Sequence, residues 1–149
     1  MTEASNFDVQ LFLPYLLSQA AEVSSAEFQQ VYKSRYGMLR TEWRVLFHLG
    51  GGGMTASQIG SLAKIHKTKV SRAVQRLAER RFLTRARDTG DRRVEHLKLT
   101  RSGRAALDDL LKVAERYDAA LMRDMTPGET RVLRSALQKL ITQTTPRFT

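Results

Sequence analysis

Residues 64–104 read KIHKTKVSRAVQRLAERRFLTRARDTGDRRVEHLKLTRSGR, and they decide both the fold and the charge distribution of this chain. The stretch contains 14 Lys and Arg residues against 4 Asp and Glu residues. The rest of the 149-residue chain contains 11 of each sign, so the whole net charge of +10 lies in this stretch. Such a concentration indicates a surface that docks on a polyanion, most often a nucleic acid. The alternative is a solvated face, although solubility does not require the charge to be concentrated.

The first part of the stretch has the periodicity of a helix that begins near His66 or Lys67. Its apolar residues lie at i, i+3, i+4 and i+7 and predict one buried stripe, formed by Val70, Ala73, Val74 and Leu77. The polar and basic residues left largely on the other side are Lys67, Thr68, Lys69, Ser71, Arg72, Gln75 and Arg76. A capping box of Thr55 and Gln58 predicts a helix just before. Two short helices joined by a tight turn predict a helix-turn-helix.

After Phe82 the periodicity changes from helix to strand. Residues 83–87 and 94–99 alternate in part, and they flank Asp88-Thr89-Gly90-Asp91-Arg92-Arg93. Asp and Gly in such a connection are typical of a turn, so the pattern predicts a β-hairpin with arginines at its tip. A hairpin directly after the second helix is a wing.

Helices are also predicted on both sides of this stretch. One long helix runs from about Leu13 to a cap at Gly37, unless a capping box of Ser24 and Glu27 divides it. A short buried helix with Thr41 as its N-cap follows and stops at the glycine run 50–53. The C-terminal part predicts a helix from Thr100 to about Asp124 and a last one after the cap at Thr126. The fold class is therefore mainly α with a small β-hairpin wing.

The composition excludes several classes of protein. There are no cysteines, which excludes a disulfide scaffold, a cysteine nucleophile and a cysteine zinc site. The three histidines are not paired at a metal-binding spacing, and we expect neither a metal nor a cofactor. No catalytic motif is present, so we expect no enzyme. The N-terminus does not look like a signal peptide and no apolar run approaches ~20 residues, so we expect a cytoplasmic protein that does not contact the membrane.

The order of elements, together with four local motifs, resembles the MarR family of bacterial winged helix-turn-helix transcription regulators. The motifs are Val70-Ser71-Arg72, the helix exit 77–83, Asp91-Arg92-Arg93, and Leu99-Thr100-Arg101-Ser102-Gly103-Arg104. The resemblance covers about residues 11–140. One departure is visible, since the family usually has Gly after the Arg that ends the second helix, and here Arg81 follows Arg80. A non-Gly residue in the left-handed cap conformation costs on the order of 1 kcal/mol. We therefore expect the helix either to keep a left-handed cap at that cost or to end differently.

The resemblance implies a homodimer and a division of the chain. Residues 9–36 and 101–145 would be the dimerisation helices of a single domain, and residues 38–100 its DNA-binding lobe. Two lobes would grip successive major grooves of a palindromic operator in double-stranded DNA. Family members typically repress transcription, and many release DNA when a small aromatic or phenolic anion binds.

The DNA-binding residues follow from this arrangement. In the second helix, Lys67, Lys69 and Arg72 suit phosphates or guanine edges, and Thr68, Ser71 and Gln75 suit base reading. At the wing, Arg92 and Arg93 suit the DNA backbone or the minor groove, whose narrow form attracts arginine. By the resemblance Asp91 supports these arginines, and its alternative role is to stabilise the turn. The full set of predicted DNA contacts is Lys67, Thr68, Lys69, Ser71, Arg72, Gln75, Arg76, Arg92 and Arg93.

An effector site is placed only by the family layout. Its candidates are Tyr36, Arg40, Trp43, Phe47 and His48, with Arg40 as the partner of an anionic ligand. The alternative is that Trp43 and Phe47 belong to the core and Arg40 to the surface.

Two other functions compete with sequence-specific regulation. A non-specific architectural or RNA-binding protein would use the same basic surface, with strong salt dependence and little sequence preference. The polar residues Thr68, Ser71 and Gln75 argue against it, because a purely electrostatic binder does not need them. A membrane-surface binder ranks last, because the apolar stripe of the basic helix is expected to lie in the core.

Overall fold

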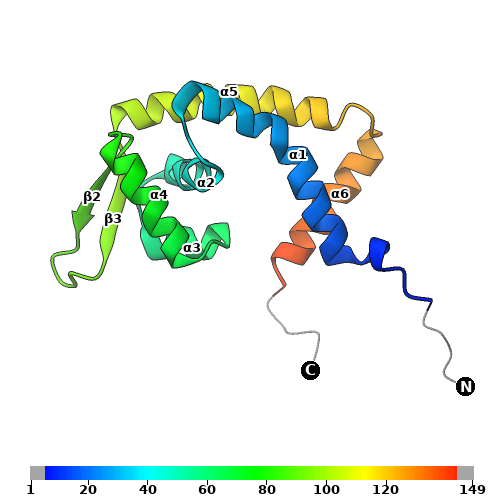
Figure 1. Ribbon diagram of the computed structural model, residues 1–149, viewed down its shortest axis with the longest axis horizontal. Coiled ribbons are helices and arrows are strands. Elements are labelled where there is room, and N and C mark those ends of the chain that lie inside the picture. Colours follow the sequence, from blue (N-terminus) through cyan, green and yellow to red (C-terminus); the bar gives the residue numbers. More distant parts are fainter. Residues whose placement is uncertain (1–5, 144–149) are drawn as a thin grey trace, which may run out of the picture. The chain divides into compact units, whose positions relative to one another are not determined.

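The structure is a computed structural model, and it describes residues 6–143. It is mainly helical with one small antiparallel sheet (Figure 1), as the sequence predicts. The helices and strands are η1 (Val9–Leu11), α1 (Leu13–Tyr36), α2 (Arg40–His48), η2 (Leu49–Gly51), β1 (Met54–Thr55), α3 (Ala56–Ala63), α4 (Lys67–Glu79), β2 (Leu83–Arg87), β3 (Glu95–Leu99), α5 (Arg101–Leu121) and α6 (Pro127–Ile141).

The chain divides into two compact units, Met1–Val113 and Ala114–Thr149. The core of the first unit lies among α2, α3, α4, the sheet and the first half of α5. Its most buried large side chains include Met38, Leu46, Ile59, Leu77, Leu97, Leu107 and Leu110. The predicted stripe of α4 belongs to this core, since all four of its residues are buried.

The sheet has the strand order β1-β3-β2. The predicted hairpin is confirmed, with Leu83 opposite Leu99 and Arg87 opposite Glu95. A third strand, β1, was not predicted; it pairs Met54 with Leu97. Two residues are too short to show the alternation by which a strand is recognised in a sequence.

Helix α1 is continuous, so the capping box of Ser24 and Glu27 does not divide it. The Ser25 hydroxyl instead donates to the carbonyl of Ala21 one turn earlier, which is compatible with a helix interior. Gly37 ends α1 with φ of 62°, as predicted.

The prediction that Thr41 caps the next helix is wrong. Helix α2 begins at Arg40, and Leu39 occupies the extended N-cap position. The buried carboxylate of Glu42 accepts a hydrogen bond from the Leu39 backbone N–H. An acidic side chain reaching back from the third helical position therefore replaces the hydroxyl cap.

Helix α5 is capped as predicted, since the Thr100 hydroxyl accepts from the Gly103 N–H at 3.0 Å. It ends at Leu121, a few residues before the predicted Asp124. Helix α6 begins with the predicted capping box of Thr126 and Glu129. Residues 144 and 145 of the predicted segment 101–145 lie outside the described residues.

Within residues 6–143, no helix combines the length and the apolarity that a membrane crossing needs.

Candidate nucleic-acid interface

Helix α4 presents a polar and basic face to solvent. His66 is its N-cap, and the ring Nδ1 accepts a hydrogen bond from the Thr68 N–H at 3.2 Å. The burial of one stripe leaves the opposite side exposed, and every DNA contact predicted on this helix is exposed there: Lys67, Thr68, Lys69, Ser71, Arg72, Gln75 and Arg76. The amide of Gln75 donates to Glu79 at 3.2 Å, so one of its donors already has a partner within the helix.

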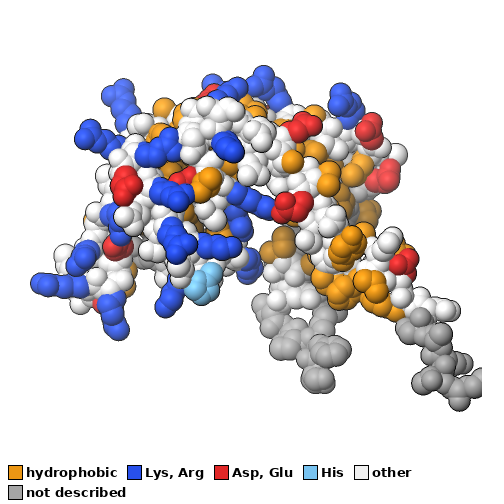
Figure 2. All heavy atoms as spheres, viewed as in Figure 1, with side chains coloured by type: hydrophobic (Ala, Val, Ile, Leu, Met, Phe, Trp, Pro, Cys, Tyr) orange, Lys and Arg blue, Asp and Glu red, His pale blue; other side chains and the backbone are white. Residues whose placement is uncertain are grey.

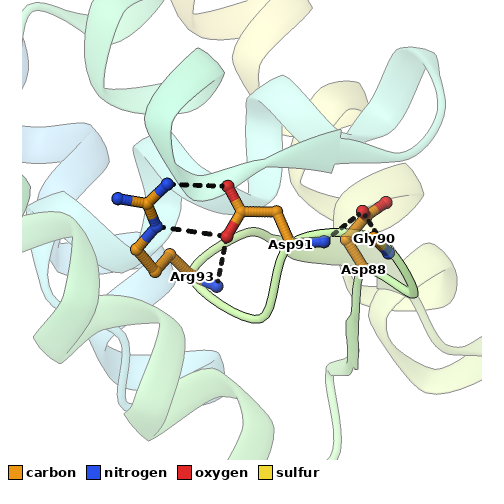
Figure 3. Close-up of polar contacts among 4 residues, drawn as sticks. All are labelled: Asp88, Gly90, Asp91 and Arg93. Atoms are coloured by element: carbon orange, nitrogen blue, oxygen red, sulfur yellow. Dashed lines mark hydrogen bonds and ion pairs between the residues drawn. The ribbon is translucent and has the colours of Figure 1, made fainter.

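The turn of the wing is organised by two carboxylates (Figure 3). Asp88 accepts hydrogen bonds from the N–H groups of Gly90 at 2.9 Å and Asp91 at 3.0 Å. Asp91 in turn contacts Arg93, with Nε to Oδ1 at 3.2 Å and Nη2 to Oδ2 at 3.3 Å, and accepts its backbone N–H. Both roles considered for Asp91, holding an arginine and stabilising the turn, are therefore present, and the arginine is Arg93.

These contacts shift the acidity of both wing carboxyls. The pKa of Asp91 is lowered, first by the hydrogen bond from the Arg93 side chain and then by that from its backbone. The pKa of Asp88 is lowered, first by the hydrogen bond from His96, whose Nε2 lies 2.9 Å from Oδ1, and then by the turn N–H groups. Both carboxylates therefore remain ionised at neutral pH and keep the wing turn in place.

A second ion pair links the two strands of the wing. The Arg85 guanidinium donates to Glu95 through Nε at 2.7 Å and Nη2 at 2.9 Å, a bidentate arrangement. The hydrogen bond to Glu95 raises the pKa of Arg85. The pair therefore stiffens the hairpin at the end that carries the turn.

A cleft of about 260 Å³ lies where the start of α3, the middle of α4 and the wing meet. Ser57, Ser71 and Arg93 are among the residues that line it. The fold thus brings Ser71 and Arg93, predicted as contacts from two separate motifs, to one cleft. Arg92, the other predicted wing contact, is exposed.

The candidate effector residues are divided between the surface and an aromatic cluster. Trp43 is half-buried, stacked on Tyr32 at 5.9 Å and edge-on to Phe28 at 5.1 Å, whereas Phe47 is 51% exposed. Arg40 pairs with Glu22 at 3.2 Å. The Tyr36 hydroxyl donates to Asp109 at 2.7 Å, so this candidate already has a partner in the protein.

Among the described residues, no group of three or more His, Asp or Glu side chains is arranged to hold a metal ion.

Comparison with known proteins places this interface in a family. Residues 36–94, which include α2 to α4 and most of the wing, match the model of the MarR family. The MarR family transcriptional regulator SPO1453 from Silicibacter pomeroyi DSS-3 superposes with a TM-score of 0.75 at 28% identity, over 91% of this chain and 99% of that one. Over residues 36–94 this chain therefore matches the MarR family, and its fold resembles that of a MarR family regulator. The family match and this neighbour indicate a DNA-binding transcription regulator.

Two further relatives agree with the assignment. The HTH-type transcriptional regulator YwaE of Bacillus subtilis (strain 168) is 25% identical over 125 residues, which is 83% of this chain and 73% of YwaE. BpsR of Bordetella bronchiseptica shares the fold with a TM-score of 0.83 at 23% identity, over 94% of this chain and all of that one. The DNA binding of BpsR is regulated by 6-hydroxynicotinic acid.

Basic residues are prominent on the surface of the first unit (Figure 2). Three residues that shape that surface were not found from the sequence: Arg80, Glu95 and Asp109. Arg80 and Asp109 act through partners distant in sequence, such as Asp109 with Tyr36, so no local spacing signals them. The bidentate Arg85–Glu95 pair was the one open to prediction, because both residues belong to strands predicted to form one hairpin.

Proposed function

We propose that this MarR-family regulator is a cytoplasmic homodimer that binds a palindromic operator and represses transcription. The observation that carries the proposal is the division of α4 into a buried apolar stripe and an exposed face of polar and basic residues. That face lies in the stretch that contains the whole net charge of the chain. A helix that is fixed by the core and polar outward is suited to enter a major groove.

In this proposal α4 contacts base edges and the wing contacts the DNA backbone. Arg72 suits a guanine edge or a phosphate, and Thr68 and Ser71 suit base edges. Arg93 reaches DNA from the wing together with Arg92, and Asp91 sets its orientation. A dimer would place two such lobes on half-sites about one helical turn apart.

The dimer is supported by apolar side chains that this single chain leaves exposed around the start of α1. The exposed ones there include Val9 at 66% and Leu11 at 69%. Monomeric soluble proteins rarely expose large contiguous apolar patches, so a second copy of the chain is the proposed cover. Other exposed large apolar residues of this segment are Phe7, Phe12, Leu13, Tyr15 and Leu16.

Selection from random duplexes tests the proposal, with affinities then measured across a salt series. We expect a palindromic consensus bound at least ~10³-fold more tightly than a scrambled duplex. The variant Arg72→Ala should weaken specific binding by about 1–3 kcal/mol, whereas Arg116→Ala, an exposed residue of α5, serves as the charge-matched control. If no consensus emerges and both duplexes weaken with the same salt slope, the chain is a non-specific architectural binder instead.

A second candidate function is release of DNA by a small aromatic anion. Arg40, Arg44 and His48 recur every four residues on α2, beside Trp43 and Phe47. Burial lowers the pKa of Arg44, and the charge of Arg40 lowers it further. Burial likewise lowers the pKa of His48, with Arg44 adding to the effect. Cations that disfavour one another in a partly dry site gain from a bound carboxylate, and BpsR responds to such an acid.

The single tryptophan of the chain makes this candidate measurable. Titration with 6-hydroxynicotinic acid should change Trp43 fluorescence and weaken operator binding. Both changes should occur over the same range of acid concentration. Arg40→Ala should raise the dissociation constant of the acid, while Arg116→Ala should leave it unchanged. Unchanged fluorescence and unchanged operator affinity at millimolar acid would remove this acid as an effector of the proposed site.

A further inference from the structure

The C-terminal ends of α1 and α4 meet at Arg80, an exposed residue of the basic stretch whose guanidinium contacts the end of α1. Its guanidinium donates to the carbonyl of Tyr36, the last residue of α1. The same group lies 5.2 Å from the centre of the Phe82 ring. The Tyr36 ring meets the Phe82 ring edge-on, with centroids 6.1 Å apart. Arg80 is thus held by a charge-assisted hydrogen bond and a cation–π contact.

The same end of α1 is tied to α5. The Tyr36 hydroxyl donates to Oδ2 of Asp109 at 2.7 Å, and Nη1 of Arg35 lies 3.1 Å from each carboxylate oxygen. These hydrogen bonds lower the pKa of Asp109, the one from Tyr36 most, so the carboxylate remains charged at neutral pH. We call Arg35, Tyr36, Arg80, Phe82 and Asp109 the Arg80 junction.

The backbone on both sides of the junction is also held by close contacts. Gly37 has φ of 62°, and a Cβ added there would lie 3.3 Å from Nη2 of Arg80. On the far side, the Thr100 hydroxyl donates to the carbonyl of Arg81 at 2.6 Å, and the Thr100 N–H donates to that of Phe82 at 3.1 Å. The segment that leaves α4 is therefore fixed by α1 on one side and by the cap of α5 on the other.

We propose that Arg80 is a positioning residue, which sets the angle at which α4 presents its face to DNA, and does not itself contact DNA. The proposal rests on the DNA reading proposed above for α4. Rotation of α4 against α1 and α5 would have to break the Arg80–Tyr36 bond and separate Arg80 from Phe82. The competing role is a phosphate contact, which the charge of Arg80 alone would suggest.

The two roles differ in how binding depends on salt and on sequence. A phosphate contact contributes equally to all duplexes, and its loss lowers the salt slope by about 1. A positioning residue contributes to the specific complex, because only base contacts require an exact helix angle. Arg80→Ala should therefore lower affinity for the selected consensus by about three- to thirtyfold, with the salt slope and the affinity for scrambled DNA unchanged.

Three variants of the full chain complete the test, each assayed on consensus and scrambled duplexes across the same salt series. Arg80→Lys keeps the charge but not the planar group, so it should lose specificity as Arg80→Ala does, whereas a phosphate contact would be rescued by lysine. Tyr36→Phe removes the bond to Asp109 without changing any basic residue and should lower the specificity ratio by a smaller factor. Arg116→Ala removes one positive charge elsewhere and should leave the ratio unchanged.

Each result has one meaning. A fall in the salt slope for Arg80→Ala, or rescue by lysine, makes Arg80 a DNA contact and overturns the proposal. A lower thermal stability with an unchanged specificity ratio makes the junction merely structural and overturns it too. An unchanged ratio for Tyr36→Phe removes Asp109 from the positioning role. If the wild-type chain selects no consensus, the proposed function fails, whatever the variants do.

Discussion

Helices α4 and α6 have similar lengths and similar apolar periodicity, yet they differ in what covers them. Helix α4, with 13 residues, buries Val70, Ala73, Val74 and Leu77. Helix α6, with 15 residues, buries none of its side chains, and its apolar stripe of Leu133, Leu137 and Leu140 is only half-buried. Burial stabilises by roughly 25 cal/mol per Å² of apolar surface, so α4 gains this free energy from packing within one chain, and α6 gains little of it. Amphipathicity therefore predicts that the apolar face of a helix will be covered. It does not predict whether the same chain or a second chain covers it.

Helix α1 shows the same contrast within one element. Phe28 and Tyr32, in its C-terminal half, are buried against the lobe, and Trp43 of α2 lies beside both. In its N-terminal half, Leu16 is 42% exposed and Val23 76% exposed. The proposed dimer would cover part of this exposed apolar surface. The stability of the N-terminal half of α1 would then depend on protein concentration more than that of the C-terminal half.

The largest expected effect is on the covered helix. Leu77→Ala should lower the free energy of unfolding by about 3 kcal/mol, because a fully buried leucine leaves a cavity. Denaturant titration at one fixed protein concentration measures the change. Leu62→Ala, at an exposed residue of α3, should stay within about 0.5 kcal/mol. Equal losses for the two variants would contradict the core described for α4.

A charge on the uncovered stripe should act on assembly. Leu137→Asp in α6 should raise the dimer dissociation constant at least tenfold, roughly 1.4 kcal/mol, because a carboxylate would be buried without a partner. Sedimentation across a concentration series measures it, and circular dichroism checks that the helices persist. Ser135→Asp adds the same charge about 200° around the helix, on an exposed residue, and should not dissociate the dimer. Dissociation by both variants, or by neither, would count against α6 as a dimer surface.

Relief of backbone strain after α4 should give a smaller gain. Arg81 has φ of 64°, a conformation that glycine adopts freely. Arg81→Gly should therefore raise the free energy of unfolding by about 0.5–1 kcal/mol, after allowance for the greater freedom of glycine in the unfolded chain. Arg87→Gly, at the end of the extended strand β2, should instead lower it. A loss for Arg81→Gly would mean that the arginine side chain stabilises the helix exit more than its backbone strains it.

The smallest effect concerns pH and is local to the wing. The folded-state pKa of Asp88 is lowered below its unfolded value, so its hydrogen bonds contribute fully above the ordinary carboxyl range and are lost as pH falls through the folded value. Exchange of the Gly90 and Asp91 amides should accelerate below about pH 4, relative to amides of α4, once intrinsic rates are corrected. In Asp88→Asn the corrected rates should no longer show this acid-dependent step. A step that persists in the variant would assign it to another carboxyl.

Most of the secondary structure was open to prediction because its signals are local. The cap at Gly37, the capping box of Thr55 and Gln58, and the period of α4 each lie within a few residues. The failures also have local causes. Strand β1 is too short to show a period. Glu42 caps α2 from inside the helix, and the hydroxyl of Thr41 suggested a different cap. For the site, the sequence predicted which residues of α4 would be exposed, because the buried stripe fixes the opposite face.

The sequence by itself determined the winged helix-turn-helix, its basic surface and the residues of its outward face, since periodicity, caps and charge depend on neighbours along the chain. Only the tertiary structure decided that Asp91 holds Arg93, that Ser71 and Arg93 line one cleft, and that the guanidinium of Arg80 contacts Tyr36 and Phe82. The physical reason is that the partner of a charged side chain depends on which groups the fold brings within reach. Whether an arginine meets a carbonyl, a ring or DNA depends on the packing of helices far apart in the sequence.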